Sequence, residues 1–215
     1  SLIKKELAKA EAFAEEAEKL AEELSRSIEE DQLGCTGETY KKYIKSKDLE
    51  ECKLAEANIS GTKFPTYTNL NKANMEGATA TKVTLFRAKL RGVKAKNADF
   101  TGANLRFVDA EGIDLSSAQL VGTKLVNAKL KNADFGEANC SKADFKNANI
   151  TKANFEGADL SEALNLEETI GSVKSCPGKD KLPKGYKCST SRSPSFTKPV
   201  FDTDSPSLDP KNWGG

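Results

Sequence analysis

Large apolar residues recur at every fifth position through the middle of the chain. Taken as the centres of five-residue units, they keep one register from Leu70 to Leu160, which makes nineteen consecutive units. The residue two places before a centre is usually Ala, the residue just before it is often Asp or Asn, and the residues after it are mostly polar, as in "NADFTGANL" and "KNADFGEANC". A period of five fits neither a helix nor a strand. So short a repeat predicts a solenoid whose turns bury their apolar edges against neighbouring turns.

The unit Ala–Asp/Asn–Leu/Phe–x–x resembles the repeat of pentapeptide-repeat proteins, over about half of the chain. The resemblance implies an all-β solenoid, a right-handed quadrilateral β-helix in which four units form one square coil. Three earlier units are centred on Leu54, Ile59 and Phe64, so the β-helix is expected to have about five and a half coils. Six residues separate Phe64 from Leu70, which predicts one inserted residue near Pro65.

Centres twenty residues apart are expected to stack into columns inside the coils. In two units where the small position holds Val, the next centre is reduced to Ala: Val93 with Ala95 and Val108 with Ala110. Such trading of volume within a unit is what close packing requires. The Asp and Asn residues before the centres are expected to bond turn backbone, a structural and not a catalytic role. The predicted core includes Leu85, Leu105, Leu125, Phe135, Phe145 and Phe155.

The repeat divides the chain into five segments. Residues 1–33 lack Gly and Pro and are rich in strong helix formers, which predicts a long amphipathic helix. Residues 34–52 are interpreted as a cysteine-containing N-terminal cap that, with the helix, covers the open end of the β-helix over 53–163. Residues 164–188 are expected to form a C-terminal cap with a disulfide loop. Residues 189–215 are expected to form an extended arm that binds a partner.

The predicted N-terminal helix has an apolar seam with alternate spacings of four and three residues, which is a heptad pattern. Its ten acidic and five basic residues give it a charge of −5, which argues against binding to an anionic membrane surface. Packing on its own solenoid, docking on another protein and a frayed extension all remain open. The seam consists of Ile3, Leu7, Ala10, Ala14, Ala17, Ala21, Leu24 and Ile28, with Phe13 and Leu20 widening it.

Five cysteines occur in the chain. Cys140 is a unit centre, where a buried thiol serves as a small apolar group. The other four flank the solenoid as two pairs, which predicts the disulfides Cys35–Cys52 and Cys176–Cys188 and an oxidising compartment. The alternative is four reduced thiols in a cytosolic protein. Neither pair has the short spacing of a zinc knuckle, so no metal site is expected.

Two groups of apolar residues are candidate partner contacts. On the coils, the outward positions are polar except for Phe86, Phe107, Val121 and Val126, which are expected to form or border a patch near Arg87, Arg106 and Lys146. This patch is interpreted as a partner contact, with cover by the chain's own helix or tail and plain exposure as alternatives. The arm has the composition of a disordered segment, so it needs something to hold it. Its proposed anchors, in a partner or on its own solenoid, are Phe196, Phe201 and Trp213.

The sequence offers little for catalysis or for cofactor binding. Histidine is absent, which removes the commonest general base and metal ligand. Cys140 is predicted to be buried and therefore a poor nucleophile. No glycine-rich phosphate loop follows a strand, and no run of eighteen apolar residues could span a membrane. We therefore expect no enzyme, no cofactor and no membrane-spanning segment.

These features favour a structural subunit that docks on the protein subunits of a larger complex. The resemblance implies a location, because several plant pentapeptide-repeat proteins reside in the thylakoid lumen. A start at Ser1, which suggests processing, and paired cysteines fit the lumenal side of a photosynthetic membrane complex; the periplasm is an alternative. Other pentapeptide-repeat proteins mimic DNA and bind gyrase through acidic surfaces. Residues 53–163 hold 16 basic and 12 acidic residues, a balance of +4, so neither mimicry nor nucleic-acid binding is expected. Self-association through the heptad helix is a further alternative.

Overall fold

The computed structural model describes residues 2–190 and 196–197, and within the first helix it describes the side chains of residues 4–9 and 11–25. Its regular elements are few and lie at the two ends of the molecule. The helices are α1 (Leu2–Leu33) and α2 (Tyr40–Tyr43), and the strands are β1 (Lys187–Cys188) and β2 (Phe196–Thr197). Short 3-10 turns span Ile44–Ser46, Leu166–Glu168 and Lys179–Lys181.

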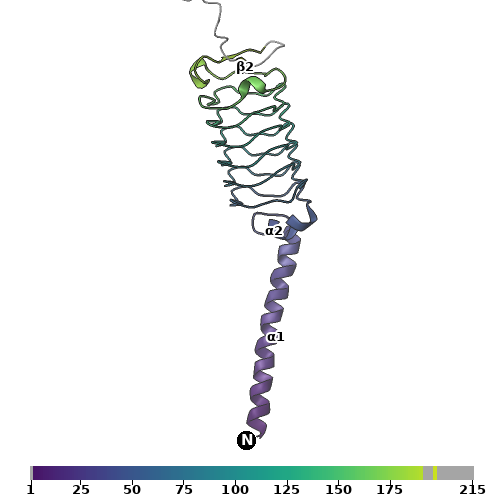
Figure 1. Ribbon diagram of the computed structural model, residues 1–215. Helices are drawn as coiled ribbons and strands as arrows, with labels where there is room; N and C mark the ends of the chain where they lie inside the picture. Colours follow the sequence, from purple (N-terminus) through teal and green to yellow (C-terminus); the bar gives the residue numbers. More distant parts are fainter. Residues whose placement is uncertain (1, 191–195, 198–215) are drawn as a thin grey trace, which may run out of the picture.

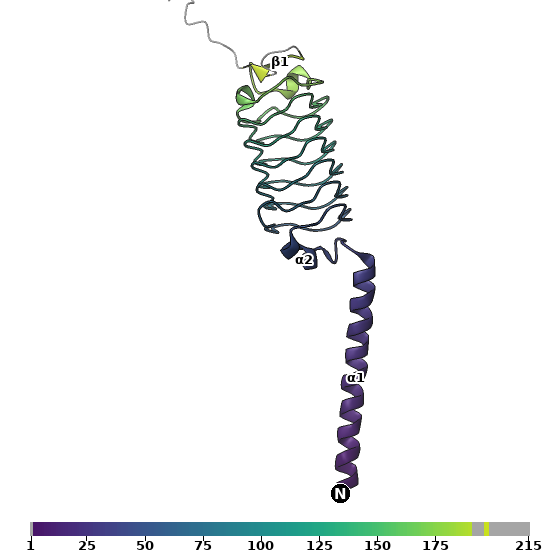
Figure 2. The same ribbon diagram turned by 90° about the vertical axis from the view of Figure 1, so that its right-hand side faces the viewer.

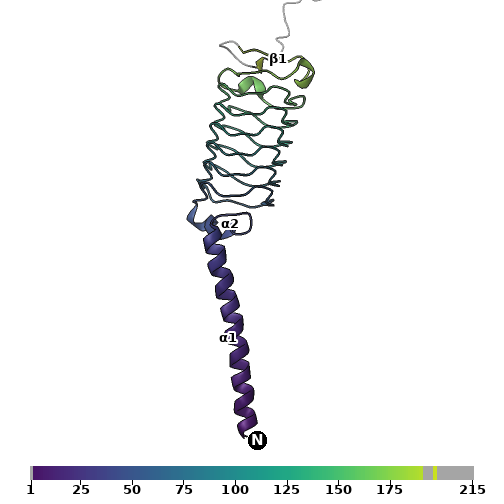
Figure 3. The ribbon, with the colours of Figure 1, turned by 180° about the vertical axis from the view of Figure 1, so that it is seen from behind.

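The repeat folds into stacked coils that form one straight column (Figures 1 and 3). Parallel bridges join residues 20 apart, from the pair Asn69 and Lys89 to the pair Asp144 and Leu164, so four pentapeptides make one coil. Each coil is tied to the next through its backbone; Leu85 N–H, for example, donates to the carbonyl of Asn104 at 2.9 Å. This is the arrangement of the quadrilateral β-helix that the five-residue repeat implies.

The unit centres fill the interior of the column. The rings of Phe135 and Phe155, on successive coils, stack 4.8 Å apart at an interplanar angle of 3°. Phe145 meets both of them edge to face, at 5.8 and 6.0 Å. Alanines at the small positions are buried beside them. The six expected core residues are all buried, with at most 2% of any of them exposed: Leu85, Leu105, Leu125, Phe135, Phe145 and Phe155.

The column contains two changes of register. Bridged residues are 21 apart from the pair Asp48 and Asn69 to the pair Lys63 and Thr84, and 20 apart from the pair Asn69 and Lys89, which confirms one inserted residue near Pro65. The second change was not predicted. Bridges are again 21 residues apart from Asn149 to its partner Ile170, and they continue past Leu160, where the sequence period ends.

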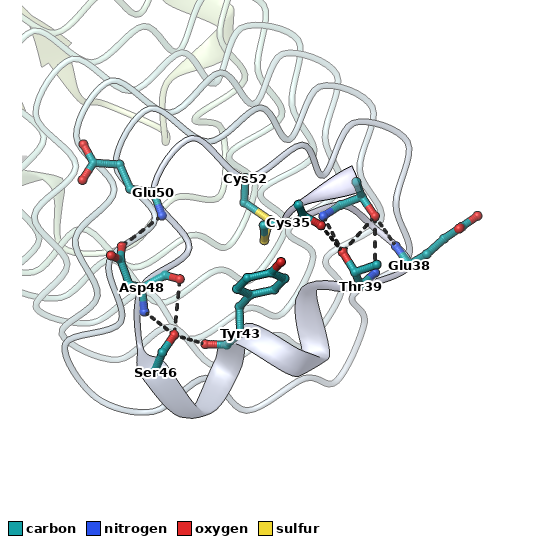
Figure 4. Close-up of a disulfide and its surroundings, with 10 residues drawn as sticks. Cys35, Glu38, Thr39, Tyr43, Ser46, Asp48, Glu50 and Cys52 are labelled. Carbon is teal, nitrogen blue, oxygen red and sulfur yellow. Dashed lines mark hydrogen bonds between the residues drawn. A yellow bond between two sulfur atoms is a disulfide. The ribbon is translucent and has the colours of Figure 1, made fainter. Parts of the chain in front are cut away.

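The N-terminal end of the column is closed by the segment that follows α1 (Figure 4). A disulfide joins Cys35 to Cys52. The ring of Tyr40 in α2 is buried 6.1 Å from that of Phe64, and its hydroxyl lies 3.1 Å from the hydroxyl of Thr62. These contacts cover the apolar interior of the first coil. None of the described side chains of helix α1 takes part in them, so over those residues the helix does not cover this end, contrary to expectation.

Helix α1 instead extends away from the coils along the direction of the column (Figures 1 and 2). Every one of its described side chains is exposed. Large apolar residues are among them: Leu7 is 59% exposed, Phe13 70%, Leu20 60% and Leu24 64%. No helix in the described part of the chain is long and apolar enough to cross a membrane.

The C-terminal end is closed by a short antiparallel ladder. A disulfide joins Cys176 to Cys188, and Cys188 in β1 pairs with Phe196 in β2. The ring of Phe196 is 1% exposed and meets the ring of Phe155 edge to face at 5.6 Å. Phe196 therefore seals its own solenoid, and its assignment to a partner-binding arm is wrong. The other proposed anchors of the arm, Phe201 and Trp213, lie outside the described residues.

Candidate docking surface

Three bulky residues stack at one corner of the solenoid on consecutive coils. Tyr67, Arg87 and Phe107 have backbone φ angles of +66°, +59° and +59°, in the left-handed region. The same corner holds Asn127 and Asn147 on the next two coils. Left-handed backbone suits Gly or Asn, because the Cβ of other residues crowds a carbonyl oxygen at a cost of about 1–2 kcal/mol. The fold therefore does not require aromatic rings or a guanidinium at this corner.

The guanidinium of Arg87 is held among three aromatic rings. Its Nη1 donates a hydrogen bond of 2.8 Å to the hydroxyl of Tyr67. Its Cζ lies 5.9 Å from the ring centre of Tyr67, 5.3 Å from that of Phe86 and 5.4 Å from that of Phe107. The negative faces of the rings attract the cation. Arg87 is thus fixed in place while its side chain stays exposed. The hydrogen bond to Tyr67 uses one of the five N–H donors of the guanidinium and leaves the other four for other partners.

The rings around Arg87 also contact each other. Phe86 and Phe107 meet edge to face, with centres 5.6 Å apart and planes at 78°. A second guanidinium, that of Arg106, lies 5.9 Å from the ring centre of Phe107. Phe107 is 38% exposed and Phe86 is half-buried. We call Tyr67, Phe86, Arg87, Arg106 and Phe107 the aromatic–arginine patch.

The face of the column that carries this patch has a surplus of positive charge. The bridge ladder that runs from Lys63 through Lys124 to Asp144 follows this face. Lys146 is neutralised by an ion pair of 3.6 Å to Glu168. The remaining cations form no ion pair within the described part of the chain. We call this face, whose charged residues are Lys63, Arg87, Arg106, Lys124, Asp144 and Lys146, the basic face.

On the next face around the column, some cations are paired within the chain. There Arg91 binds Asp109 at 2.8 Å, and Lys131 binds Glu111 at 3.3 Å. Hydrogen bonding to Asp109 raises the pKa of Arg91 above its ordinary value. Two cations on that face therefore have carboxylates of the same chain as partners, whereas Lys89 and Lys129 of the same ladder form no ion pair among the described residues. The basic face differs in that its unpaired cations include the guanidinium that is held among aromatic rings.

Reactive chemistry is weakly represented in the described residues. No group of three or more Cys, Asp or Glu side chains there is arranged to hold a metal ion. The thiol of Cys140, the free cysteine, is buried inside the column. Burial, and then the charge of Asp159, raise the pKa of this thiol far above its ordinary value, so the nucleophilic thiolate does not form near neutral pH.

Comparison with known proteins agrees with the geometry of the coils. A family profile described as "Pentapeptide repeats" matches in eight copies, over residues 66–94, 98–136 and 128–164. The solenoid belongs to the pentapeptide-repeat family. No curated protein sequence matches the chain.

Several solved structures of pentapeptide-repeat proteins are similar to the chain. One, from the Arabidopsis thaliana thylakoid lumen, is 25% identical with a TM-score of 0.35. The match covers 49% of this chain and 66% of the Arabidopsis chain, so this chain spans just under two thirds of the length of that protein. Rfr23 of the cyanobacterium Cyanothece 51142 is 21% identical with a TM-score of 0.38, over 68% and 98% of the two chains. Trypsin-treated QnrB1, a plasmid-mediated fluoroquinolone resistance protein, is 18% identical with a TM-score of 0.31, over 60% and 79%.

The pentapeptide-repeat coils bring together part of the apolar set expected from the sequence. Phe86 and Phe107 are in contact, and the backbone N–H of Phe107 donates to the carbonyl of Val126 on the next coil at 3.0 Å. Val126 is half-buried. Val121, also half-buried, follows the centre Leu120 and therefore lies on the preceding face.

Tyr67 is the member of the patch that sequence reasoning missed. It lies in the interrupted unit before Leu70, which was treated only as a break in the repeat. The structure places Tyr67 at the corner below Arg87, in the 20-residue register of the later coils. The signal was available, because Tyr67 lies twenty residues before Arg87 and forty before Phe107.

Proposed function

We propose that this pentapeptide-repeat protein is a non-catalytic scaffold that docks through its basic face on an acidic surface of another protein. The observation that carries the proposal is the fixed guanidinium of Arg87 among Tyr67, Phe86 and Phe107. A guanidinium matches the geometry of a carboxylate and binds it through two parallel hydrogen bonds. Because Arg87 is already positioned, binding costs little additional side-chain entropy.

Composition supports a protein as the partner. Aromatic residues and Arg are enriched at the centres of protein interfaces, and they account for most residues whose truncation costs much binding energy. The patch places two guanidinium groups beside three rings, and Lys63 and Lys124 extend the positive charge along the same face. The complementary surface presents Asp or Glu side chains around an apolar or aromatic residue.

We place this scaffold in an oxidising compartment, as a subunit on the lumenal side of a photosynthetic membrane complex. The two disulfides, Cys35–Cys52 and Cys176–Cys188, support an oxidising compartment. The thylakoid lumen is the compartment that the resemblance to plant pentapeptide-repeat proteins implies. Thiol labelling of the native protein tests the placement: labelling of Cys35 or Cys52 before reduction would contradict it.

The docking proposal is tested with short fluorescent peptides in which Glu residues flank a Phe or Leu. Matched peptides carry Gln in place of Glu. The chain is expected to bind the acidic peptides, more weakly as salt rises, and to bind the Gln peptides at least about tenfold more weakly, because hydrogen bonds to charged groups contribute about 1.5–3 kcal/mol each.

A pair of double variants locates the binding site. Arg87→Gln with Arg106→Gln removes two charges from the patch, and Lys94→Gln with Lys96→Gln removes two exposed charges from a different face. Both variants have the same net charge, so long-range attraction is matched. Only the patch variant is expected to lose binding, by about tenfold or more. Equal losses in the two variants, or equal binding of the Glu and Gln peptides, would refute the proposal.

A further inference from the structure

Helix α1 presents an apolar stripe that nothing in the described structure covers. Leu7, Phe13, Leu20 and Leu24 are each between 59% and 70% exposed. At 100° per residue these side chains lie on one side of the helix, with Ala14, Ala17 and Ala21 between them. Lone apolar side chains on a surface are ordinary, but a continuous stripe along a projecting helix indicates a partner.

Charge along the helix indicates which partner the stripe fits. Residues 4–9 contain Lys4, Lys5 and Lys9 with one acid, Glu6, a net charge of +2. Residues 11–25 contain six acids and one base, a net charge of −5. The basic start of one copy is therefore complementary to the acidic later part of a second copy that runs in the opposite direction. Two parallel copies would place like charges together along their whole length.

We propose that two copies of this protein associate through α1 as an antiparallel coiled coil. The heptad pattern then pairs Leu7 of one copy with Leu24 of the other, and Ala14 with Ala17. The same register brings Phe13 opposite Leu20 at the flank of the seam, so the widest part of the stripe is covered from both sides. In a parallel pair, Phe13 would face Glu18 instead, because the residues that flank a parallel seam face each other five positions apart. The small alanines let the two backbones approach closely.

The shape of the molecule is compatible with this arrangement. Because α1 extends away from the coils, an antiparallel pair places the two solenoids at opposite ends of the helix pair, where they do not collide (Figure 2). The helix has 32 residues, so it spans about 48 Å. The dimer would be a two-headed scaffold with one basic face at each end. This inference does not depend on what the basic face binds.

Cross-linking tests the direction of the pair with two single variants of the full chain, Leu7→Cys and Leu24→Cys. Each is treated with a short bismaleimide, alone and after mixing; Cys140 is buried and the remaining cysteines are in disulfides. An antiparallel pair gives cross-linked dimer only in the mixture, because residues 7 of the two copies are then about 25 Å apart. Cross-linking within each variant alone indicates a parallel pair and overturns the proposal. Absence of any cross-link overturns the Leu7–Leu24 register.

Sedimentation equilibrium tests association itself, with a matched pair of charge variants. Leu20→Glu places a carboxylate in the stripe, whereas Ala12→Glu adds the same charge on the opposite side of the helix. The wild-type chain and the Ala12→Glu variant are expected to dimerise, and the Leu20→Glu variant to dissociate at least about tenfold more readily. A monomeric wild-type chain at micromolar concentration, or equal weakening in both variants, would overturn the proposal. Circular dichroism checks that the coils of each variant remain folded.

Discussion

Replacing Phe107 by Gly and by Ala separates the cost of its backbone conformation from the contribution of its ring. Both substitutions remove the contact with Phe86 at 5.6 Å and the contact with Arg87 at 5.4 Å. Each of these contacts contributes about 0.5–1.5 kcal/mol. Only Gly also removes the crowding that the left-handed φ of +59° imposes on a residue with a Cβ. That crowding costs about 1 kcal/mol.

The Gly variant is therefore expected to be more stable than the Ala variant by about 1 kcal/mol. This order is the reverse of the usual one, in which Gly is about 0.5–1 kcal/mol less favourable than Ala within regular structure. Urea denaturation followed by circular dichroism measures the difference, provided that the two variants have equal m-values. Both variants are also expected to lose binding to the acidic peptides, since both lack the ring beside Arg87.

Arg106 supplies the control, one residue earlier in the same turn. It is exposed and does not have a left-handed backbone, so Arg106→Ala is expected to be more stable than Arg106→Gly. If Ala is the more stable substitution at both positions, the corner does not impose the conformational cost assigned to it. In that case the presence of a bulky ring at Phe107 no longer indicates a role beyond folding.

Three further predictions concern the core and the caps. Leu105→Ala, inside the column, is expected to lower the free energy of unfolding by about 2–5 kcal/mol in the same urea assay, and a loss below 1 kcal/mol would contradict tight packing there. Cys188→Ser removes the disulfide to Cys176 and is expected to destabilise the pairing of β1 with β2 by about 2–4 kcal/mol. Amide hydrogen exchange in β2 should then become faster. Unchanged exchange would show that the disulfide does not hold that strand. Hydrogen bonds from Ser161, above all from its backbone N–H, lower the pKa of Asp159 in the folded chain. The carboxylate of Asp159 therefore contributes fully to stability at pH values above its pKa in the unfolded chain. This contribution is lost as pH falls through the lower pKa of the folded chain. An Asp159→Asn variant should then lose less stability between pH 7 and pH 3 than the wild type does, and equal losses would contradict the assignment.

The regular part of the fold could be predicted because each unit repeats the same physical constraint. A large apolar centre and a small residue two places before it define an inner edge, and four such edges bring residues 20 apart into register. The buried column of Phe135, Phe145 and Phe155 follows from that arithmetic. The insertion near Pro65 was also visible, because one break in a strict period shifts every later residue.

The closing elements could not be predicted in the same way, because no repeat constrains them. Phe196 lies in a stretch rich in Ser and Pro, and its composition predicted an arm that would bind a partner. Its burial against Phe155 depends on the loop that the Cys176–Cys188 disulfide closes and on two strand pairs, all of which are tertiary contacts. The second register change, before Ile170, is hidden for the same reason, since the five-residue period has ended there.

The sequence by itself determined that the chain is a pentapeptide-repeat solenoid with an apolar core, a nearly neutral surface and a heptad helix in front of it. Those properties are periodic or compositional, so they can be read without coordinates. The tertiary structure decided which outward side chains meet. It placed Tyr67 beneath Arg87, surrounded that guanidinium with three rings, and left the stripe of α1 exposed. Which side chains touch on successive coils depends on the register of the coils and on the backbone conformation at their corners. Both are set only when the coils stack.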